Sequence, residues 1–150
     1  MKKKGFTLIE LLAVIAIIAI ISLIAVPNII NISDNIRKNN MLDDAKKLIS
    51  LAKLKVNADY EIRNFTKENI CNEDSKYCIF SYDTLNENKD IQKEADSDAQ
   101  YSSSSYVKYF LSGDIVNYCV YLDGSKRHIG TNENCVSESG LYANNVVQTK

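Results

Sequence analysis

The sequence is poor in the residues from which most catalytic and metal sites are built. Its 150 residues include one histidine, His128, and no tryptophan. No two of the four cysteines have the C-x-x-C spacing that is typical of zinc ligands. A G-x-S-x-G nucleophile motif and a glycine-rich phosphate-binding loop are both absent. We therefore expect a protein that is not an enzyme, with no catalytic residues, no bound metal and no cofactor.

The chain also lacks a strong net charge. It carries 18 Lys and Arg residues against 19 Asp and Glu residues, which gives a formal charge of −1. Surfaces that bind nucleic acid are usually strongly basic, so direct binding of nucleic acid is not indicated. The length is sufficient for one domain in addition to a membrane span, and no internal repeat is visible.

A long apolar run near the start is the most distinctive feature. Lys2, Lys3 and Lys4 precede a run from Phe6 to Val26, which is 21 residues long. A bilayer core of about 30 Å requires roughly 20 helical residues. A secretory signal peptide has an apolar run of roughly 7–15 residues followed by a small-residue cleavage site, and neither property applies here. On these grounds alone we expect a single membrane span with its lysine-rich end in the cytoplasm.

Glu10 does not suit a plain membrane anchor. A carboxylate within the hydrocarbon raises the free energy by a few kcal/mol unless it is paired or neutralised. No lysine, arginine or histidine lies between Phe6 and Asn35. Only a free amino terminus could serve as a cationic partner, which requires a cut before Phe6. The new amine would then lie about one helical turn from Glu10, in the same chain or in a neighbouring copy.

The segment Lys-Gly-Phe-Thr-Leu-Ile-Glu-Leu, from Lys4 to Leu11, resembles the cleavage and assembly motif of type IV pilins and of the related pseudopilins. The resemblance is close from residue 4 to about residue 30. It implies that prepilin peptidase cuts between Gly5 and Phe6, and that Phe6 becomes the N-methylated amino terminus. It also implies that Glu10 pairs with a neighbour's amino terminus during assembly and that Pro27 breaks the helix.

The same resemblance implies a structural subunit of a type IV pilus, which polymerises into a surface filament for adhesion, motility or DNA uptake. An alternative is a pseudopilin of a type II secretion or competence system. The implied partners are further copies and related pilins, prepilin peptidase, a platform protein and an assembly ATPase. The subunit would cross the cell membrane once before assembly and lie in an extracellular filament afterwards. A membrane-tethered extracellular binding domain, an alternative of another class, leaves Glu10 unexplained.

The predicted organisation is a leader peptide over residues 1–5, a transmembrane and assembly helix over 6–27, and a globular head over 28–150. Apolar residues at steps of three or four predict an amphipathic helix over 28–60, continuous with the first. The variable loop 61–105 is predicted to be a long polar connection, partly mobile, with a short helix near 91–96. We interpret its Asp96-Ser97-Asp98 cluster as a solvated turn rather than a cation site.

The C-terminal part, residues 106–150, has the signals of a small sheet. Aromatic and β-branched runs at 106–111, 115–122 and 126–129 are separated by glycine-containing turns, which predicts an antiparallel meander. A short last strand is expected at 146–147. In the middle run, one face is assigned to the helix side and consists of Val116, Tyr118, Val120 and Leu122. The predicted fold class is α+β, a long N-terminal helix packed on an antiparallel meander, as in the type IV pilin fold.

Four cysteines, Cys71, Cys78, Cys119 and Cys135, permit three disulfide pairings, and spacing alone does not choose among them. An extracellular head would allow oxidation. We favour Cys71–Cys78, which closes a small loop, together with Cys119–Cys135. The second pair would resemble the C-terminal disulfide loop of many pilins. His128 is interpreted as an ordinary strand residue.

Overall fold

The structure is a computed structural model that describes residues 7–149, except for the side chains of residues 24–28. The chain divides into two compact units, Met1–Ile36 and Arg37–Lys150, and each is described by itself. Within the part of the chain that is described, no helix has the length and apolar character needed to cross a membrane. The membrane span expected over residues 6–27 therefore stays a prediction.

Helix α1, Leu8–Ala58, is the longest element and contributes to both units. The sequence predicted one helix from Phe6 to about Tyr60. The structure confirms this helix over Leu8–Ala58, and Phe6 lies outside the described residues. The assigned helix does not end at Pro27. Proline lacks the N–H that would bond to the carbonyl four residues earlier. A local break at Pro27 stays a prediction, because that side chain lies outside the described residues.

In the second unit, α1 carries the apolar stripe that the sequence predicted. The buried residues of this stripe recur at steps of three or four and are Met41, Leu42, Ala45, Leu48, Ile49, Ala52 and Val56. The helix ends at Ala58 because Asp59 adopts an extended backbone, with φ −115° and ψ 116°. The Asp59 carboxylate accepts hydrogen bonds from the first backbone N–H groups of α2, Tyr60–Arg63, and so starts a new helix.

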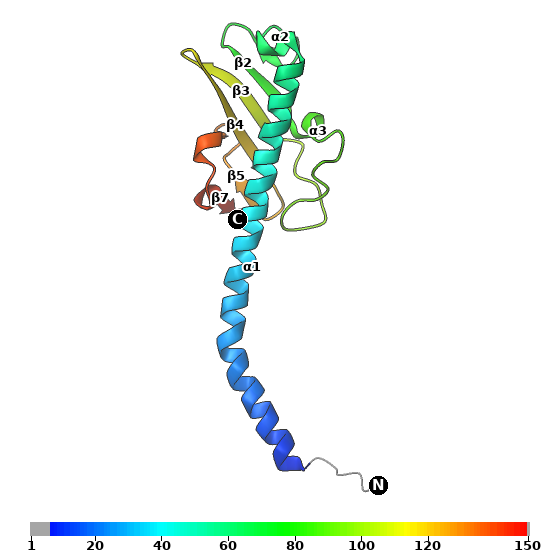
Figure 1. Cartoon of the computed structure of the whole chain (residues 1–150), viewed down its shortest axis with the longest axis vertical. Helices are drawn as coiled ribbons and strands as arrows, with labels where there is room; N and C mark the ends of the chain where they lie inside the picture. The colour runs from blue at the N-terminus through cyan, green and yellow to red at the C-terminus, as the bar shows by residue number, and fades with distance from the viewer. Residues whose placement is uncertain (1–6, 150) are drawn as a thin grey trace. The chain divides into compact units, whose positions relative to one another are not determined.

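The second unit contains a seven-stranded antiparallel sheet (Figure 1). Its strand order is β1-β2-β3-β4-β5-β7, and β6 pairs with β4. The strands are β1 Cys71–Asn72, β2 Tyr77–Ser81, β3 Tyr106–Ser112, β4 Ile115–Asp123, β5 Arg127–Ile129, β6 Val136–Ser137 and β7 Val146–Gln148. Three short helical segments complete the unit: α3 Tyr82–Leu85, η1 Glu138–Gly140 and η2 Ala143–Asn145. The predicted α+β arrangement is confirmed.

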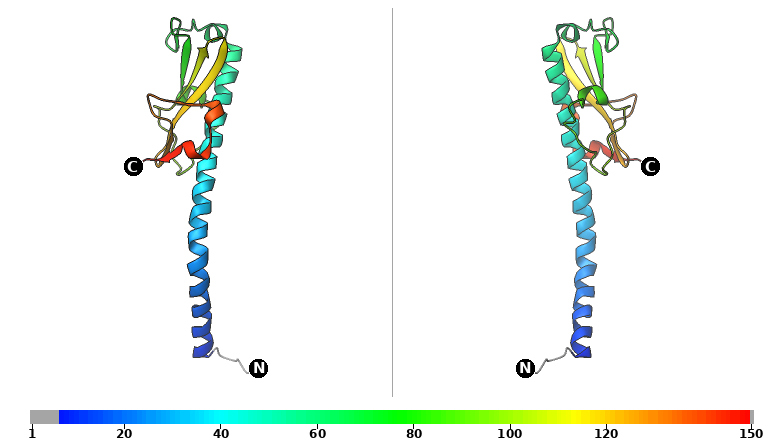
Figure 2. Two further views of the ribbon diagram at one scale, coloured as in Figure 1. Left: turned by 90° about the vertical axis from the view of Figure 1, so that its left-hand side faces the viewer. Right: turned by 90° about the vertical axis from the view of Figure 1, so that its right-hand side faces the viewer.

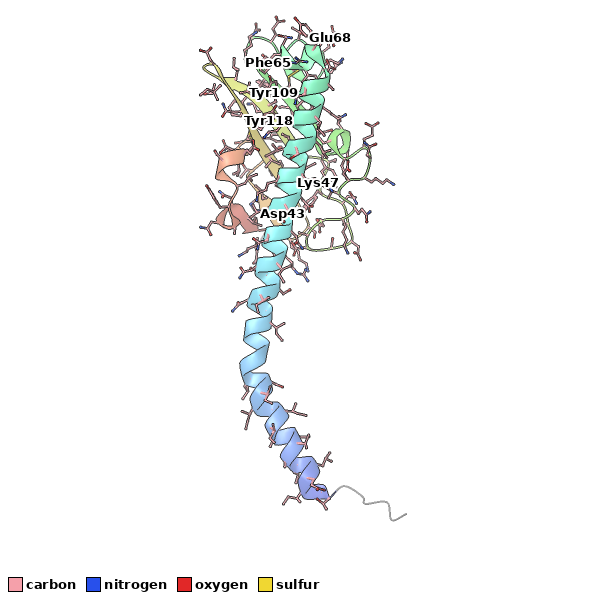
Figure 3. The ribbon with its side chains drawn as sticks, viewed as in Figure 1. Asp43, Lys47, Phe65, Glu68, Tyr109 and Tyr118 are labelled. Carbon is pink, nitrogen blue, oxygen red and sulfur yellow. A yellow bond between two sulfur atoms is a disulfide. The ribbon has the colours of Figure 1, made fainter. Side chains whose placement is uncertain are left out.

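One face of the sheet packs on the head portion of α1 (Figure 2). Val107 of β3 lies opposite Val120 of β4, and both are fully buried in the core shared with the helix. The predicted inward face of β4 is confirmed at Val120 and Leu122, and Tyr118 is partly buried against the same core. Val116, which was predicted to share this face, is 47% exposed. Figure 3 shows Phe65, Tyr109 and Tyr118 near the α2 end of the unit, where the rings of Phe65 and Tyr109 stack at 4.8 Å.

The opposite face of the sheet is partly covered by the chain between β5 and β6. The Cys119–Cys135 disulfide joins this segment to β4, and the Tyr106 hydroxyl donates a 3.1 Å hydrogen bond to the carbonyl of Asn132. Gly130 makes the close approach possible, because its φ is +75° and an added Cβ would lie 2.7 Å from the carbonyl oxygen of Asn134. Cys119 is consequently buried although it faces away from α1.

Both disulfides that the sequence favoured are present in the structure. Cys71 and Cys78 lie directly opposite each other on β1 and β2, with their Cα atoms 3.9 Å apart. The Cα atoms of Cys119 and Cys135 are 5.4 Å apart. No cysteine is left free. The first bridge closes the turn between two strands, and the second holds the C-terminal segment on the sheet.

The segment 61–105 is more ordered than the sequence predicted. It contains β1, β2 and α3, whereas the short helix expected near residues 91–96 is absent from the structure. The loop after α3 folds around the Asn86 side chain, which accepts a hydrogen bond from the N–H of Ile91 and donates another to its carbonyl, both 2.8 Å long. Buried polar groups of this kind hold the loop against the rest of the unit.

The interpretation of Asp96 as part of a solvated turn is wrong. Its side chain is only 5% exposed and forms an ion pair with Arg127 of β5, which is 6% exposed. Arg37 of α1 reaches the same carboxylate at 3.4 Å. The Asp96 carboxylate can be buried because Arg127, 31 residues later in the sequence, supplies the compensating charge. Asp98 alone fits the expectation, since it is exposed and pairs with Lys93.

Candidate functional site

The start of α1 is built by a reciprocal pair of side chains, Thr7 and Glu10. The carbonyl of Thr7 accepts the first hydrogen bond of the helix, from the N–H of Leu11 at 3.3 Å. The Thr7 hydroxyl accepts a bond from the N–H of Glu10 at 3.4 Å, while the Glu10 carboxylate accepts the N–H of Thr7 at 2.8 Å. This is a capping box, in which a threonine before the helix and a glutamate three positions later satisfy each other's backbone donors.

A third bond strengthens this pair. The Thr7 hydroxyl donates to Oε2 of Glu10 at 2.8 Å, so Oε2 accepts two donors from the same residue. The carboxylate also lies in the first turn of the helix, where the positive end of the helix dipole favours a negative charge. Glu10 is therefore held at the amino end of α1 and exposed to solvent in the single chain.

The helix that follows this cap is apolar on all sides. From Leu8 to Leu23 its large apolar side chains are between 47% and 78% exposed, the lowest value being that of Val14. The one hydroxyl in this stretch, that of Ser22, donates to the carbonyl of Ile18 at 2.8 Å, so this donor needs no hydrogen bond to water. A helix with no polar face is expected to be buried, either in a membrane or among other helices.

Only some of the predicted site residues at the start of the chain are among those that the structure describes. It describes Glu10, but Gly5 and Phe6 lie outside the described residues, so the cleavage and methylation sites stay predictions. Sequence reasoning missed Thr7. The pattern Thr-x-x-Glu directly before an apolar run is a recognised helix-start signal, and it could have identified Thr7 without a structure.

The head contains buried ionisable groups that act on the fold. Burial raises the pKa of Asp44 on α1, and the hydrogen bond from the Tyr101 hydroxyl opposes that rise. Burial likewise raises the pKa of Tyr101. The pKa of Glu94 is lowered, because hydrogen bonds from Ser125 and Ser97 outweigh the effect of burial. Asp44, Tyr101 and Glu94 all have hydrogen-bonding partners, and these bonds hold the loop between α3 and β3 in place.

Among the described residues, no group of three or more histidine, cysteine, aspartate or glutamate side chains is placed to hold a metal ion. His128 lies in β5, as the sequence predicted, and its Nδ1 is 3.4 Å from the Thr149 hydroxyl. The cysteines are all in disulfides. Of the features described, the capped apolar helix at the start of α1 is the one that the fold of the head does not explain.

Comparison with known proteins supports this choice of site. A family model described as the prokaryotic N-terminal methylation motif matches residues 1–26. This is the prepilin motif of type IV pilins, so the chain carries the N-terminal signature of a type IV pilin or pseudopilin-like precursor. The motif is that of a structural protein rather than an enzyme. Searches of curated proteins and of solved structures gave no match.

Proposed function

We propose that the chain is a structural subunit of a type IV pilus. Prepilin peptidase cuts between Gly5 and Phe6, and Phe6 becomes the N-methylated terminus. Before assembly the subunit crosses the cell membrane once through residues 6–27. The assembly ATPase and platform protein then add it to a filament, in which the apolar helices of many copies form the core and the heads lie outside.

The observation that supports this proposal is the combination of one carboxylate with an otherwise apolar, exposed helix. Apolar side chains exposed in this way favour association, because fully burying one leucine or isoleucine side chain lowers the free energy by about 1.5–3 kcal/mol. Packing against equivalent helices of other copies buries those side chains. A carboxylate in such a core must be neutralised, and an amino terminus of a neighbouring copy supplies the opposite charge.

Processing changes the charge in the direction that assembly requires. Cutting after Gly5 removes Lys2, Lys3 and Lys4, which would otherwise keep the start of the chain in the cytoplasm. It also creates one positive charge on Phe6, four residues before Glu10. A cationic group next to the amino end of a helix is unfavourable by itself, so it gains from a nearby carboxylate. Glu10 of an adjacent copy can provide that carboxylate.

The test compares Glu10→Val with Glu68→Val, which removes an exposed acid from the head (Figure 3). Filaments are sheared from the cells, and the mature subunit is measured in the filament and membrane fractions. Glu10→Val should leave the processed subunit in the membrane and absent from filaments, whereas Glu68→Val should assemble normally. Normal filaments from Glu10→Val would contradict the proposal.

Two further measurements separate the alternatives. The intact mass of the filament subunit should match residues 6–150 with one methyl group, and a mass that includes the leader would contradict processing. Labelling the head on intact cells should mark surface filaments. Absence of the subunit from surface filaments, together with loss of protein secretion or transformation on deletion, would favour the pseudopilin alternative.

A further inference from the structure

The hydrogen bonds at the start of α1 assign an assembly role to a second residue. We infer that Thr7 positions the Glu10 carboxylate for the amino terminus of a neighbouring copy, by holding one carboxylate oxygen and leaving the other available. The inference rests on the proposed function, because it concerns the same contact between subunits. It adds Thr7 as a positioning residue. It also gives the two oxygens of Glu10 different partners, Thr7 for one and the neighbour's amine for the other.

The two oxygens of the carboxylate have different surroundings. Oε2 accepts both the backbone N–H and the hydroxyl of Thr7, each at 2.8 Å. Within the described residues, 7–149, no group donates a hydrogen bond to Oε1 of Glu10. An ionised carboxylate offers about four lone-pair sites, so the two bonds from Thr7 leave Oε1 able to accept an ammonium group. Capping of the subunit's own helix and pairing with a neighbour are therefore compatible.

Holding the carboxylate in advance favours assembly in a measurable way. A free glutamate side chain loses rotamer freedom when it is fixed in an interface, and this loss opposes binding. The capping box fixes the side chain within the single subunit, before a neighbour arrives. Preorganisation of one such side chain is expected to change association by about two- to tenfold. The Thr7 hydroxyl can be removed by substitution with valine, whereas the backbone N–H of residue 7 remains in that variant.

The experiment uses four full-length variants, each co-expressed with the wild-type chain. Thr7→Val removes the hydroxyl with little change in shape, and Thr7→Ser retains a hydroxyl. Glu10→Val removes the carboxylate. Ser22→Ala is the matched control, since it removes a hydroxyl from the same apolar helix, where the donor is bonded to the carbonyl of Ile18. Mass spectrometry gives the ratio of variant to wild type in sheared filaments and, separately, among processed subunits in the membrane.

Dividing the filament ratio by the membrane ratio removes any effect on cleavage, which matters because Thr7 is close to the cut. The normalised incorporation of Thr7→Val should fall about two- to tenfold. Thr7→Ser and Ser22→Ala should stay within twofold of wild type, and Glu10→Val should fall further than Thr7→Val. Wild-type incorporation of Thr7→Val, or an equal loss for Thr7→Ser, would overturn the role of Thr7. Failure of the wild-type chain to enter filaments would instead refute the proposed function.

Discussion

The hydroxyl of Tyr101 donates a 2.8 Å hydrogen bond to the carboxylate of Asp44 and accepts one from the N–H of Ala95 at 3.1 Å. One phenol thus joins α1 to the middle of the loop between α3 and β3, and the tyrosine itself lies near the end of that loop. Tyr101 is itself 4% exposed, so its hydroxyl has no access to bulk water as a substitute partner. This contact makes the loop part of the folded head.

Replacement of Tyr101 by phenylalanine should lower the free energy of unfolding by about 1–2 kcal/mol at pH 7, because Asp44 loses a donor while it is ionised. The loss should be smaller at pH 3, which is below the ordinary aspartate pKa of about 3.9 and therefore also below the raised native pKa of Asp44. The check is denaturant unfolding of the full chain in detergent at both pH values. Tyr142→Phe is the control, since that side chain is 67% exposed. Equal losses at the two pH values would contradict the assignment.

The raised pKa of Asp44 also makes the free energy of unfolding of the wild-type chain depend on pH. Because burial raises this pKa in the folded state, the native protein binds the proton more tightly than the unfolded chain does. The contribution of Asp44 to stability therefore falls as the pH rises from below about 3.9 to above the raised native value. An Asp44→Asn variant should lack this contribution, which the same unfolding series can measure.

Breaking the ion pair between Asp96 and Arg127 should lower the free energy of unfolding by more than the replacement of Tyr101 does. Asp96→Asn removes the carboxylate that compensates a guanidinium only 6% exposed, and should lower the free energy of unfolding by about 3 kcal/mol. Arg37→Ala, which removes the partner that is 42% exposed, should change it by less than about 1 kcal/mol. Thermal and denaturant unfolding provide the comparison. Similar effects for the two variants would mean that the pair with Arg127 is not the dominant contact.

The sequence predicted the elements whose periodicity is long and regular. The stripe on α1 and the hairpin of β3 and β4 each repeat a pattern over several residues, and both were identified. β1 and β2 were missed because they contain two and five residues and lie in a polar segment. A run as short as Tyr77–Ser81 gives little period to detect.

The sequence could not predict that the Asp96 side chain is buried, and the reason differs from that for β1 and β2. A carboxylate in a polar loop has the same local sequence whether water or a distant arginine surrounds it, and Arg127 becomes adjacent only through the fold. The capping box at Thr7 and Glu10 belongs to the opposite case. Both residues lie within one helical turn, so the local sequence contains the whole signal.

The Glu94 carboxylate should make the stability of the loop between α3 and β3 depend on pH in the acidic range. Its pKa is lowered in the folded state, because hydrogen bonds from Ser125 and Ser97 outweigh burial. The resulting stability is present above the unfolded value, about 4.3, and is lost as the pH falls through the lower native pKa. Ser125→Ala should lower the free energy of unfolding by about 1 kcal/mol at pH 7 and by less at pH 3. Ser103→Ala, at an exposed position, is the control.

The disulfides predict a specific peptide map. Digestion without reductant should release one linked pair containing Cys71 and Cys78 and another containing Cys119 and Cys135. Replacing the second pair with serines should lower the free energy of unfolding by about 3 kcal/mol, as loop entropy predicts for a closed loop of this length. Any peptide that links Cys78 to Cys119 would contradict the connectivity.

The position of the helix cap has a consequence for how polymerisation is switched on. The printed bonds of this cap join Thr7 to Glu10 and Leu11 and use no residue of the leader, so the cut that we propose after Gly5 would leave them in place. The cut would remove three lysine charges and move the terminal amine from Met1 to Phe6, so it would change the charge at the start of the chain while the cap stays formed.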